Sequence, residues 1–444
     1  MSSDWPQLSL REFIDLLAGF AFKSSGYTED SQDVRLLRGD NIAPGKVRWE
    51  GVKRWPKSRG TELSRYALEA GDVVLAMDRP WIPAGLKVAQ VKEIDTPCYL
   101  VQRVARLRAT TSEDRSFLFA LLSMPDFESY IQNATTGTAV PHISAKQILD
   151  YTFHLPPAHV RALVGAIAAG LDDRITLLRE TNATLEAIAQ ALFKSWFVDF
   201  DPVRAKMEGR APEGMDEATA ALFPDGFEES ALGAVPKGWT YQPISEVVEG
   251  VYDGPHATPP ESDSGGVFLG IKNLTGTALD LTDIRFIGEA DWAKWIKRVE
   301  PRAGDIVFSY EATLGFFALI PPGLRCCLGR RLALIRPKAD DGAGHYWFHQ
   351  FIAAPFQQLL TKHTIQGATV NRIALKEFPS YEVLSPPVSL QKTFHELATG
   401  LWDRIQTNQA QAQTLATLRD TLLPRLISGQ LRLPEAEALM EEAV

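Results

Sequence analysis

The clearest pattern along the chain is an apolar stripe at helical spacing, which occurs in two long segments. After Pro157, apolar residues follow one another at steps of three or four, with one skipped turn around Asn182. After Pro387, a second stripe includes one polar member, Asn408. Such spacing predicts amphipathic helices and is close to the a/d pattern of a coiled coil. The stripes consist of Val160, Val164, Ile167, Leu171, Ile175, Leu178, Leu185, Ile188 and Leu192, and of Phe394, Leu397, Leu401, Ile405, Asn408, Leu415, Leu418 and Leu422.

Proline pairs set the start of both predicted helices, because proline is tolerated in the first helical turn and breaks a helix interior. The pairs are Pro156–Pro157 and Pro386–Pro387, and Ser428–Gly429 gives the second helix an end. Each helix is then about 40 residues, or on the order of 60 Å, long. Because each must cover its apolar face, the two are predicted to pair antiparallel as a rigid spacer. The alternative is that both are core helices of one larger domain.

The chain also repeats itself. A shift of 230 residues places Pro156 on Pro386, Asp173 on Asp403 and Thr184 on Thr414, without a gap over about 37 residues. Two similar domains that do two similar jobs at a fixed separation are therefore predicted, and a duplication kept for stability alone is the alternative. The flanking segments repeat more loosely: residues 70–74 (AGDVV) resemble 303–307 (AGDIV), Asn41-Ile42 resembles Asn273-Leu274, and residues 137–143 (GTAVPHI) resemble 367–373 (GATVNRI).

These patterns predict an α+β fold, in which two similar α/β domains are separated by two long antiparallel helices and related by a pseudo-twofold repeat. The segment between the first helix and the second domain is Pro/Gly-rich, acidic and weakly periodic, so it is expected to be ordered but irregular. The predicted segments are a first domain at 1–154, a long helix at 155–200, a connector at 201–237, a second domain at 238–384, a second long helix at 385–429 and a tail at 430–444.

Charge and cysteine content narrow the picture. The net charge is −9, yet residues 1–154 carry 19 basic and 19 acidic side chains and residues 238–383 carry 14 and 16, so charge alone does not favour nucleic acid as a partner. Cys98, Cys326 and Cys327 lack metal-ligand spacing, which predicts a reduced, cytoplasmic protein without a zinc site. No apolar run is long enough for a membrane span, and the start lacks the features of a secretory signal.

Motifs for catalysis are missing. There is no dinucleotide fingerprint and no Gly-x-Ser-x-Gly elbow. The stretch Asp199-Phe200-Asp201-Pro202 is interpreted as a structural turn, and a cryptic active site around Asp199 and Asp201 is the alternative. The sequence therefore predicts a non-catalytic protein without a metal, used for recognition or as a scaffold.

Several stretches resemble the specificity subunits of type I restriction–modification systems, and the resemblance extends from Trp5 to Pro434. The most specific are LFKSWFVDFDPV (residues 192–203) and TLLPRLISG (residues 421–429). One departure is Ala158-His159-Val160, where the family has acidic and glutamine residues; the second copy keeps Gln391. Looser similarity is found in LPPAHVRALVGAIAAGLDDRI, TLATLRDTLLPRLISGQLRLP, RLLRGDNI, EAGDVVL, YDGPHATPP, FLGIKNL and TGTAVPHI.

The resemblance implies that each globular domain is a target-recognition domain for one half of a split, asymmetric DNA site. The helices would set the spacing and dock two methyltransferase subunits, which bring S-adenosylmethionine and methylate adenine N6. Restriction subunits would add translocation and cleavage with ATP and Mg. This chain itself would bind no cofactor and catalyse none of these reactions. A helical assembly scaffold that does not bind DNA is the alternative.

Candidate DNA-binding residues are those whose side chains suit bases or phosphates and that fall at predicted loops or strand ends. Arg330-Arg331 stands in an apolar run, which suggests an exposed face, and Gly137 and Gly367 are expected to allow a tight backbone approach. Asn41 and Asn273 have a second interpretation as turn residues. The candidates are Arg38, Asn41, Arg79, Lys87, Arg103, His142, His256, Lys272, Asn273, Arg330, Arg331, Asn371 and Arg372. Subunit-interface candidates are Leu171, Ile175, Leu185, Ile188, Trp196, Leu401, Ile405, Leu415 and Leu422.

Overall fold

The computed structural model describes residues 5–82, 84–136, 141–338, 343–367, 369–431 and 435. The chain is an α+β protein with two compact units. The first unit consists of Met1–Arg179 with Ala410–Val444, and the second of Glu180–Gln409. Each unit thus takes half of each long helix, and the six-segment division stays a prediction. Within the described residues, no helix combines the length and the apolar character that crossing a lipid bilayer requires.

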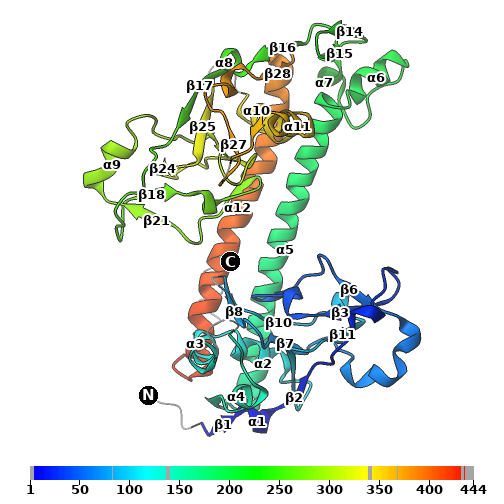
Figure 1. Cartoon of the computed structure of the whole chain (residues 1–444), viewed down its shortest axis with the longest axis vertical. Helices are drawn as coiled ribbons and strands as arrows, with labels where there is room; N and C mark the ends of the chain where they lie inside the picture. Colours follow the sequence, from blue (N-terminus) through cyan, green and yellow to red (C-terminus); the bar gives the residue numbers. More distant parts are fainter. Residues whose placement is uncertain are drawn as a thin grey trace. The chain divides into compact units, whose positions relative to one another are not determined.

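The two long helices lie within the segments 155–200 and 385–429 that the sequence predicts, and each is two or three residues shorter at both ends. Helix α5 spans Ala158–Phe197 and helix α12 spans Val388–Ile427, and each has 40 residues (Figure 1). Both begin directly after a Pro-Pro pair. Gly429 follows α12 with a φ of 72°, a left-handed conformation that glycine adopts without steric cost and that commonly ends a helix.

Within the second unit the halves of α5 and α12 pair antiparallel. Buried Asn182 donates from Nδ2 to the carbonyl of Ile405 at 3.1 Å, and buried Asn408 donates from Nδ2 to Asn182 Oδ1 at 2.8 Å. Farther along α5, the ring of Phe193 lies 5.4 Å from that of Phe394. Partner numbers fall on α12 as they rise on α5, which defines the antiparallel direction. The apparent skipped turn at Asn182 is therefore a polar layer inside the seam.

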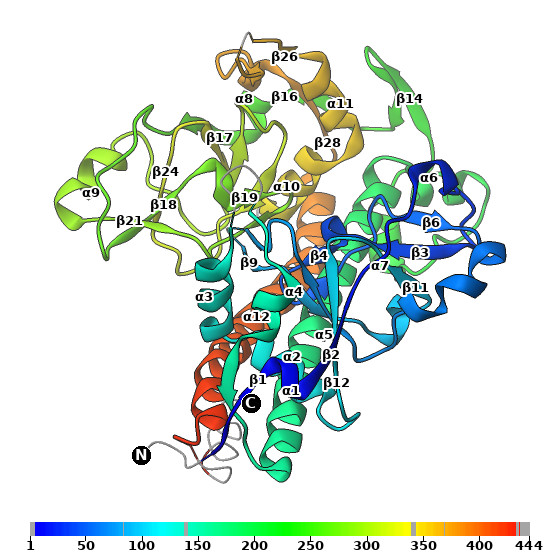
Figure 2. The same cartoon turned by 60° about the horizontal axis from the view of Figure 1, so that its bottom comes forward.

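The first unit is built on a four-stranded antiparallel sheet in the order β10-β7-β12-β2. Val73 and Leu75 face an apolar layer with α2, α3 and α5, whereas Val74 and Ala76 face a small sheet in the order β11-β3-β6. The strands β3, β6 and β11 of this small sheet are labelled in Figure 2. This alternation is the two-residue period of a strand. The bounds are β1 Gln7–Ser9, α1 Leu10–Phe13, β2 Ile14–Ala18, β3 Val34–Leu37, β4 Ile42–Ala43, β5 Lys46–Val47, β6 Lys53–Trp55, β7 Val73–Ala76, β8 Trp81–Ile82, β9 Gly85–Leu86, β10 Val88–Gln90, β11 Cys98–Leu100, β12 Val104–Ala109, α2 Arg115–Leu122, α3 Pro125–Ala134, α4 Ala145–Leu149 and β13 Thr152–His154.

The second unit has sheets of the same order. Its four-stranded sheet runs β23-β22-β25-β17, and its three-stranded sheet runs β24-β18-β21. In both units the three-stranded sheet contains one parallel pair, β3 with β11 and β18 with β24. The bounds are α6 Asp201–Met207, α7 Glu217–Ala221, β14 Phe227–Ser230, β15 Gly233–Pro236, β16 Thr240–Pro243, α8 Ile244–Val247, β17 Val248–Asp253, β18 Gly266–Leu269, β19 Leu274–Thr275, β20 Ala278–Leu279, β21 Arg285–Ile287, α9 Glu289–Trp295, β22 Ile306–Ser309, β23 Phe317–Leu319, β24 Cys326–Leu328, β25 Leu332–Pro337, α10 Gly344–Ile352, α11 Ala354–Lys362, β26 Thr364–Ile365, β27 Arg372–Ile373 and β28 Glu382–Ser385.

The connector at 201–237 is more regular than the sequence suggests. It holds the helices α6 and α7 and the hairpin of β14 and β15. Val203, Phe223 and Val235 are buried in the same aromatic core as Trp239. The periodic signal is weak because each element is short and places only one or two residues in that core.

A buried ion pair occurs at the same place in both units. Asp72 accepts from Arg108 at 2.5 and 2.7 Å, and Asp305 accepts from Arg336 at 2.9 and 2.7 Å. Each aspartate is fully or nearly buried and also accepts a backbone N–H three residues earlier in the chain. The repeated Ala-Gly-Asp segment therefore makes a turn and fixes the strand that carries the arginine.

A group of aromatic and histidine rings joins α10 to α12 in the second unit. His345 stacks on His395 and on Trp402, with ring centroids 5.1 and 5.9 Å away, and His349 Nδ1 donates to the carbonyl of His345 at 2.7 Å. Burial, together with the neighbouring His349 and His395, lowers the pKa of His345 to about 3. Burial also lowers the pKa of His349 to about 4, so both rings are neutral near pH 7.

Removal of one partner of a buried ion pair should cost far more than removal of a surface partner. We expect Asp305→Ala to lower the free energy of unfolding by about 3–5 kcal/mol, because Arg336 keeps a buried charge without its partner. Asp150 pairs with Arg11 at 2.7 Å on the surface, and Asp150→Ala should cost less than about 1 kcal/mol. Chemical denaturation followed by circular dichroism measures both; equal losses would contradict this account.

The second unit should lose stability in mild acid. The folded-state pKa values of His345 and His349 lie below the unfolded value of about 6.5. Below pH 6.5 the unfolded chain therefore binds more protons, and stability falls as the pH drops towards 4, by up to about 1.4 kcal/mol per pH unit for each histidine. His349→Phe should remove about one proton from this dependence. Urea titrations between pH 4.5 and 7.5 test it, and an unchanged slope would refute the assignment.

Candidate nucleic-acid interface

Several loops that connect the strands of the first unit lie at one edge of its sheets. In the antiparallel register, Val104 pairs with Ala76 and Val88 pairs with Leu75. The end of β7 and the starts of β10 and β12 therefore meet at this edge. The parallel strands β3 and β11 also end side by side. This edge, which we call the loop edge, brings together the segments that carry the predicted DNA-binding residues.

Asp78 holds the side chains of Arg103 and His142 at the loop edge. Its Oδ2 accepts from Arg103 Nη1 at 2.6 Å, and its Oδ1 lies 2.7 Å from His142 Nδ1. Burial raises the pKa of the Asp78 carboxyl, but hydrogen bonds from His142 and Arg103 outweigh this effect and hold the pKa below its usual value. Arg103 has a φ of 64° and Arg79 a φ of 45°, which are strained for residues with a Cβ. Such strain is typical of sites whose side chains must point in a set direction.

The second unit repeats the backbone of this arrangement. Tyr310 donates its N–H to the carbonyl of Arg331 at 3.1 Å, as Met77 donates to Arg103 at 2.9 Å. Ala312 donates to Asn371 at 3.0 Å, as Arg79 donates to residue 141 at 2.7 Å. Two pairs of predicted residues therefore hold matching positions, Arg103 with Arg331 and His142 with Arg372. The predicted residue Arg79 matches Ala312, which was not predicted.

The side chains at the matching positions are similar in charge. Glu311 occupies the position of Asp78, and its Oε2 lies 3.6 Å from Arg331 Nε. Arg372 forms an antiparallel bridge with Glu311, as His142 does with Asp78. Arg331 has a φ of 76°. Each loop edge thus presents a carboxylate with two cationic neighbours, and Arg330 beside it is exposed.

A second carboxylate in the second unit holds another predicted residue. Asp253 Oδ2 lies 3.0 Å from His256 Nε2, and its Oδ1 lies 2.5 Å from Arg298 Nη1. Asp253 ends β17, opposite Ala333 near the start of β25, and therefore belongs to the same edge. Lys272, by contrast, forms an exposed ion pair with Asp283.

Asn41 and Asn273 are withdrawn from the candidate set. Asn41 is 5% exposed; it accepts from the N–H of Arg38 at 3.1 Å and donates to the carbonyl of Arg48 at 3.0 Å. Asn273 is 2% exposed, accepts from the N–H of Gly270 at 3.0 Å and donates to two backbone carbonyls. The interpretation of Asn41 and Asn273 as turn residues is therefore correct, because each asparagine closes a turn and has no amide group directed outward.

The remaining cations of the first unit surround Lys87. Partial burial lowers the pKa of its ammonium; Asp40 offsets part of this effect, and Arg48 and Arg79 add to the lowering. Arg48 and Arg79 are exposed, and Arg38 is half-exposed and 3.5 Å from Asp40. Closely spaced positive charges repel one another, and this repulsion is relieved when an anion binds.

The subunit-interface residues predicted from the apolar stripes lie mostly inside the chain. Ile188 is 43% exposed, and Leu185 and Leu401 are partly buried. Most stripe residues are covered by the other helix and the domains, whereas Ile188 and Leu397, which are 43% and 48% exposed, retain a large apolar surface. The buried members are Leu171, Ile175, Trp196, Ile405, Leu415 and Leu422.

Sequence reasoning missed the acidic partners of the cations. Asp78 and Glu311 each follow the repeated Ala-Gly-Asp segment by six residues, and this common offset was a usable signal.

Two glycines and one acidic stretch were also singled out in the sequence. Gly137 lies outside the described residues. A Cβ on Gly367 would meet the carbonyl oxygen of Val370, so its tight approach is to its own chain. The Asp199–Pro202 stretch is a turn, as predicted: Asp201 accepts from Ser195 Oγ at 2.7 Å and begins α6.

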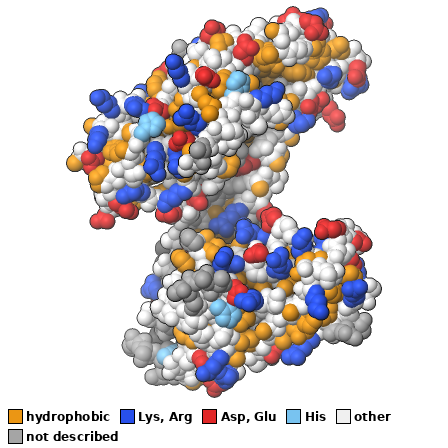
Figure 3. Space-filling model, viewed as in Figure 1, with side chains coloured by type: hydrophobic (Ala, Val, Ile, Leu, Met, Phe, Trp, Pro, Cys, Tyr) orange, Lys and Arg blue, Asp and Glu red, His pale blue; other side chains and the backbone are white. Residues whose placement is uncertain are grey.

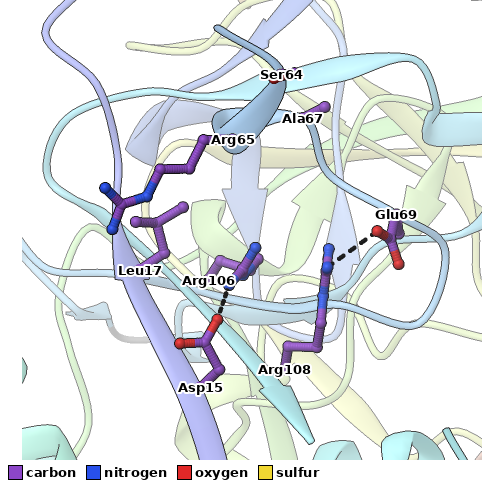
Figure 4. A pocket seen from close by; sticks show the side chains of 8 residues that line it. All are labelled: Asp15, Leu17, Ser64, Arg65, Ala67, Glu69, Arg106 and Arg108. Atoms are coloured by element: carbon purple, nitrogen blue, oxygen red, sulfur yellow. Dashed lines mark hydrogen bonds and ion pairs between the residues drawn. The ribbon is translucent and has the colours of Figure 1, made fainter. Parts of the chain in front are cut away.

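A pocket of about 400 Å³ lies beside β2 and β12 of the first unit (Figure 4). Arg106 contacts Asp15, and Arg108 Nη1 lies 3.0 Å from Glu69 Oε1. The two acids of the pocket are therefore paired with arginines.

Among the described residues, no group of three or more His, Cys, Asp and Glu could hold a metal ion. On the visible face, basic and acidic side chains are interspersed over both globular parts (Figure 3).

Comparisons with known proteins agree with this arrangement. No protein-family model matches the chain. It is 26% identical over 365 residues to the type I restriction enzyme HindI specificity subunit of Haemophilus influenzae, covering 71% of this chain and 77% of the relative. It is 22% identical to the EcoBI specificity subunit of Escherichia coli, and the match covers 96% of this chain and 86% of that relative. It is 31% identical over 184 residues to the MjaVIII specificity subunit of Methanocaldococcus jannaschii, which covers 41% of this chain and only 43% of that relative.

A solved structure extends the comparison to the fold. The S subunit of a type I restriction–modification system from M. genitalium matches with a TM-score of 0.56 at 12% identity, and the match covers 95% of this chain and 96% of that one. At this identity the match supports the fold alone. The chain is thus similar in sequence to the specificity subunits of type I restriction enzymes, and similar in fold to a solved S subunit.

Proposed function

We propose that this chain is the DNA-reading subunit of a type I restriction–modification enzyme, and that each loop edge binds one half of a bipartite, asymmetric site. The observation that carries the proposal is the repeated loop edge, with Asp78 and Arg103 in one unit and Glu311 and Arg331 in the other. A carboxylate that holds a guanidinium in place preorganises it for bidentate contact with guanine. Two such edges on matching frames suit two half-sites.

The cations at each edge divide into two roles in this proposal. Arg103, His142, Arg331 and Arg372 read base edges, because they lie beside the organising carboxylates. Residues set farther from those carboxylates position the duplex through its phosphates. The phosphate group consists of Arg38, Arg79, Lys87, His256, Lys272, Arg330 and the exposed parts of Asn371.

The long helices serve as the spacer in this proposal. The chain would consist of a duplicated unit, with α5 and α12 as an antiparallel coiled coil that sets the number of unread base pairs between the half-sites. Support comes from their equal length of 40 residues and from the buried asparagine layer, since a polar layer in a helix seam favours one register over its alternatives.

The chemistry is assigned to partner subunits. Two methyltransferase subunits would dock and supply S-adenosylmethionine for methylation of adenine N6, and restriction subunits would supply ATP- and Mg-dependent translocation and cleavage. In the proposal, this chain itself catalyses none of these reactions. Its nearly neutral domains, with net charges of 0 over residues 1–154 and −2 over residues 238–383, fit a duplex that is also held by the partners.

Exchange of one domain tests the proposal directly. Residues 238–384 are replaced by the corresponding segment of a relative with another target, and the methylated motif is determined by single-molecule sequencing of host DNA. We expect one half of the bipartite motif to change and the other half to stay. A scaffold that does not contact DNA would leave the motif as it was, and that outcome would end the proposal.

Single substitutions should separate the two half-sites. In the assembled methyltransferase complex, Arg103→Ala is expected to weaken binding by about 1–3 kcal/mol and to relax preference at one position of the first half-site. Arg331→Ala should do the same in the second half-site. Arg11→Ala, which removes a surface arginine paired with Asp150, is the matched control and should change neither. Competition binding with base-substituted duplexes is the measurement, and equal effects of Arg11 and Arg103 substitution would contradict these roles.

A further inference from the structure

One loop of the loop edge is longer in the first unit than in the second. Between β7 and β10 the first unit has the eleven residues 77–87, whereas between β22 and β23 the second unit has the seven residues 310–316. In the longer segment, Trp81 pairs with Leu86 and Ile82 pairs with Gly85 to form the hairpin of β8 and β9. The segment 310–316 contains no strand. The β8–β9 hairpin is therefore a feature of the first loop edge alone.

The hairpin is held firmly at its base. Lys87 donates its N–H to the carbonyl of Pro80 at 2.7 Å, which closes the hairpin. Gly85, with a φ of 119°, lies beside the loop between β4 and β5, where a Cβ would make ordinary van der Waals contact with Pro44 at 3.6 Å. Gly45 of that loop donates its N–H to the carbonyl of Val88 at 2.9 Å. Two short hairpins thus support each other at the loop edge.

Trp81 presents an oriented apolar surface on this hairpin. The residue is 42% exposed, and its indole Nε1 donates to Glu128 Oε1 at 2.5 Å. Gln132 donates to the same carboxylate oxygen at 3.2 Å. Because the only polar atom of the indole is already bonded within the protein, the exposed part of the ring offers apolar contact and no free donor.

The hairpin has cations at both of its ends. Arg79 and Lys87 flank the hairpin in sequence, and the charges of Arg48 and Arg79 contribute to the lowered pKa of Lys87. In the part of the chain that the structure describes, Arg48, Arg79 and Lys87 form no ion pair with a carboxylate. An exposed aromatic side chain on a hairpin with unpaired cations at its ends complements an anionic polymer with apolar groups inside its grooves.

We infer that the β8–β9 hairpin enters the major groove of the first half-site and that Trp81 packs on the C5-methyl group of a thymine there. A two-stranded ribbon fits the width of the major groove, and the thymine methyl is the apolar group that a ring without a free N–H can select there. The inference rests on the proposed function and deepens it, because it gives the first half-site a hydrophobic reading element that the second half-site lacks.

The test combines a protein variant with a DNA methyl deletion. The assembled methyltransferase complex is first used to select binding sites from a random-sequence duplex library, which defines the bipartite motif. Thymines of the first half are then replaced one at a time by deoxyuridine, which removes only the methyl group. We expect one replacement to weaken wild-type binding about 4-fold, the value for one buried methyl-sized group, and to leave Trp81→Ala unaffected.

Two variants control for folding and for nonspecific loss of apolar surface. Trp81→Phe keeps a ring without the N–H and should retain the preference for thymine over deoxyuridine. Leu232→Ala removes an exposed apolar side chain from the turn of the β14–β15 hairpin in the other unit, and should behave as wild type in both halves. Thermal unfolding of each variant checks that Trp81→Ala retains the fold.

The outcomes separate this inference from the proposed function. A bipartite motif with no thymine sensitive to methyl removal in its first half would overturn the inference, as would a Trp81→Ala complex that still discriminates thymine from deoxyuridine. Both results would leave the proposed function intact. A wild-type complex that selects no motif at all would overturn the proposed function itself.

Discussion

The structure depends on one constraint: each long helix has an apolar face that is too long for any single domain to cover. The chain meets it by burying each face in two parts. In the first unit, Leu171 and Ile175 share a core with Leu415 and Leu422, and in the second unit Phe193 lies against Phe394. Neither globular core is complete without helix residues from both halves of the sequence, so the helices are part of each domain's stability as well as a connection.

The sheets of the two units share the same strand order and the same buried ion pair, whereas the loops at their loop edges differ. The Asp72–Arg108 and Asp305–Arg336 pairs fix corresponding strands from inside, where substitution is costly. The loops at the edge have no such restraint. They differ in length and in cation identity, as His142 and Arg372 illustrate at matching positions. A frame of this kind allows recognition to change while the fold stays the same.

The sequence predicts the helices well because their period, their proline starts and their glycine end are local signals that tertiary contacts do not override. It predicts the positions of the edge residues less completely. An asparagine in a loop has the same sequence signature whether it closes a turn, as Asn41 does, or reads a base, and only its burial decides. A search for cations also passes over Asp78 and Glu311, although these acids determine where the cations point. The apolar stripe residues were assigned to partners because sequence alone does not show how completely the chain covers them.

The asparagine layer has a consequence for how such chains can be recombined. The 230-residue shift places Asn182 on Ala412 and Asn408 on Leu178, so the layer occurs once although the helices are related. A chain made by duplicating its own first half would set Asn182 against leucine, so Asn182 Oδ1 would lose the N–H that Asn408 donates, and a buried acceptor without a partner costs about 1–3 kcal/mol. The sheet-bearing segments can therefore be inherited separately, whereas the two helices are best inherited as a matched pair.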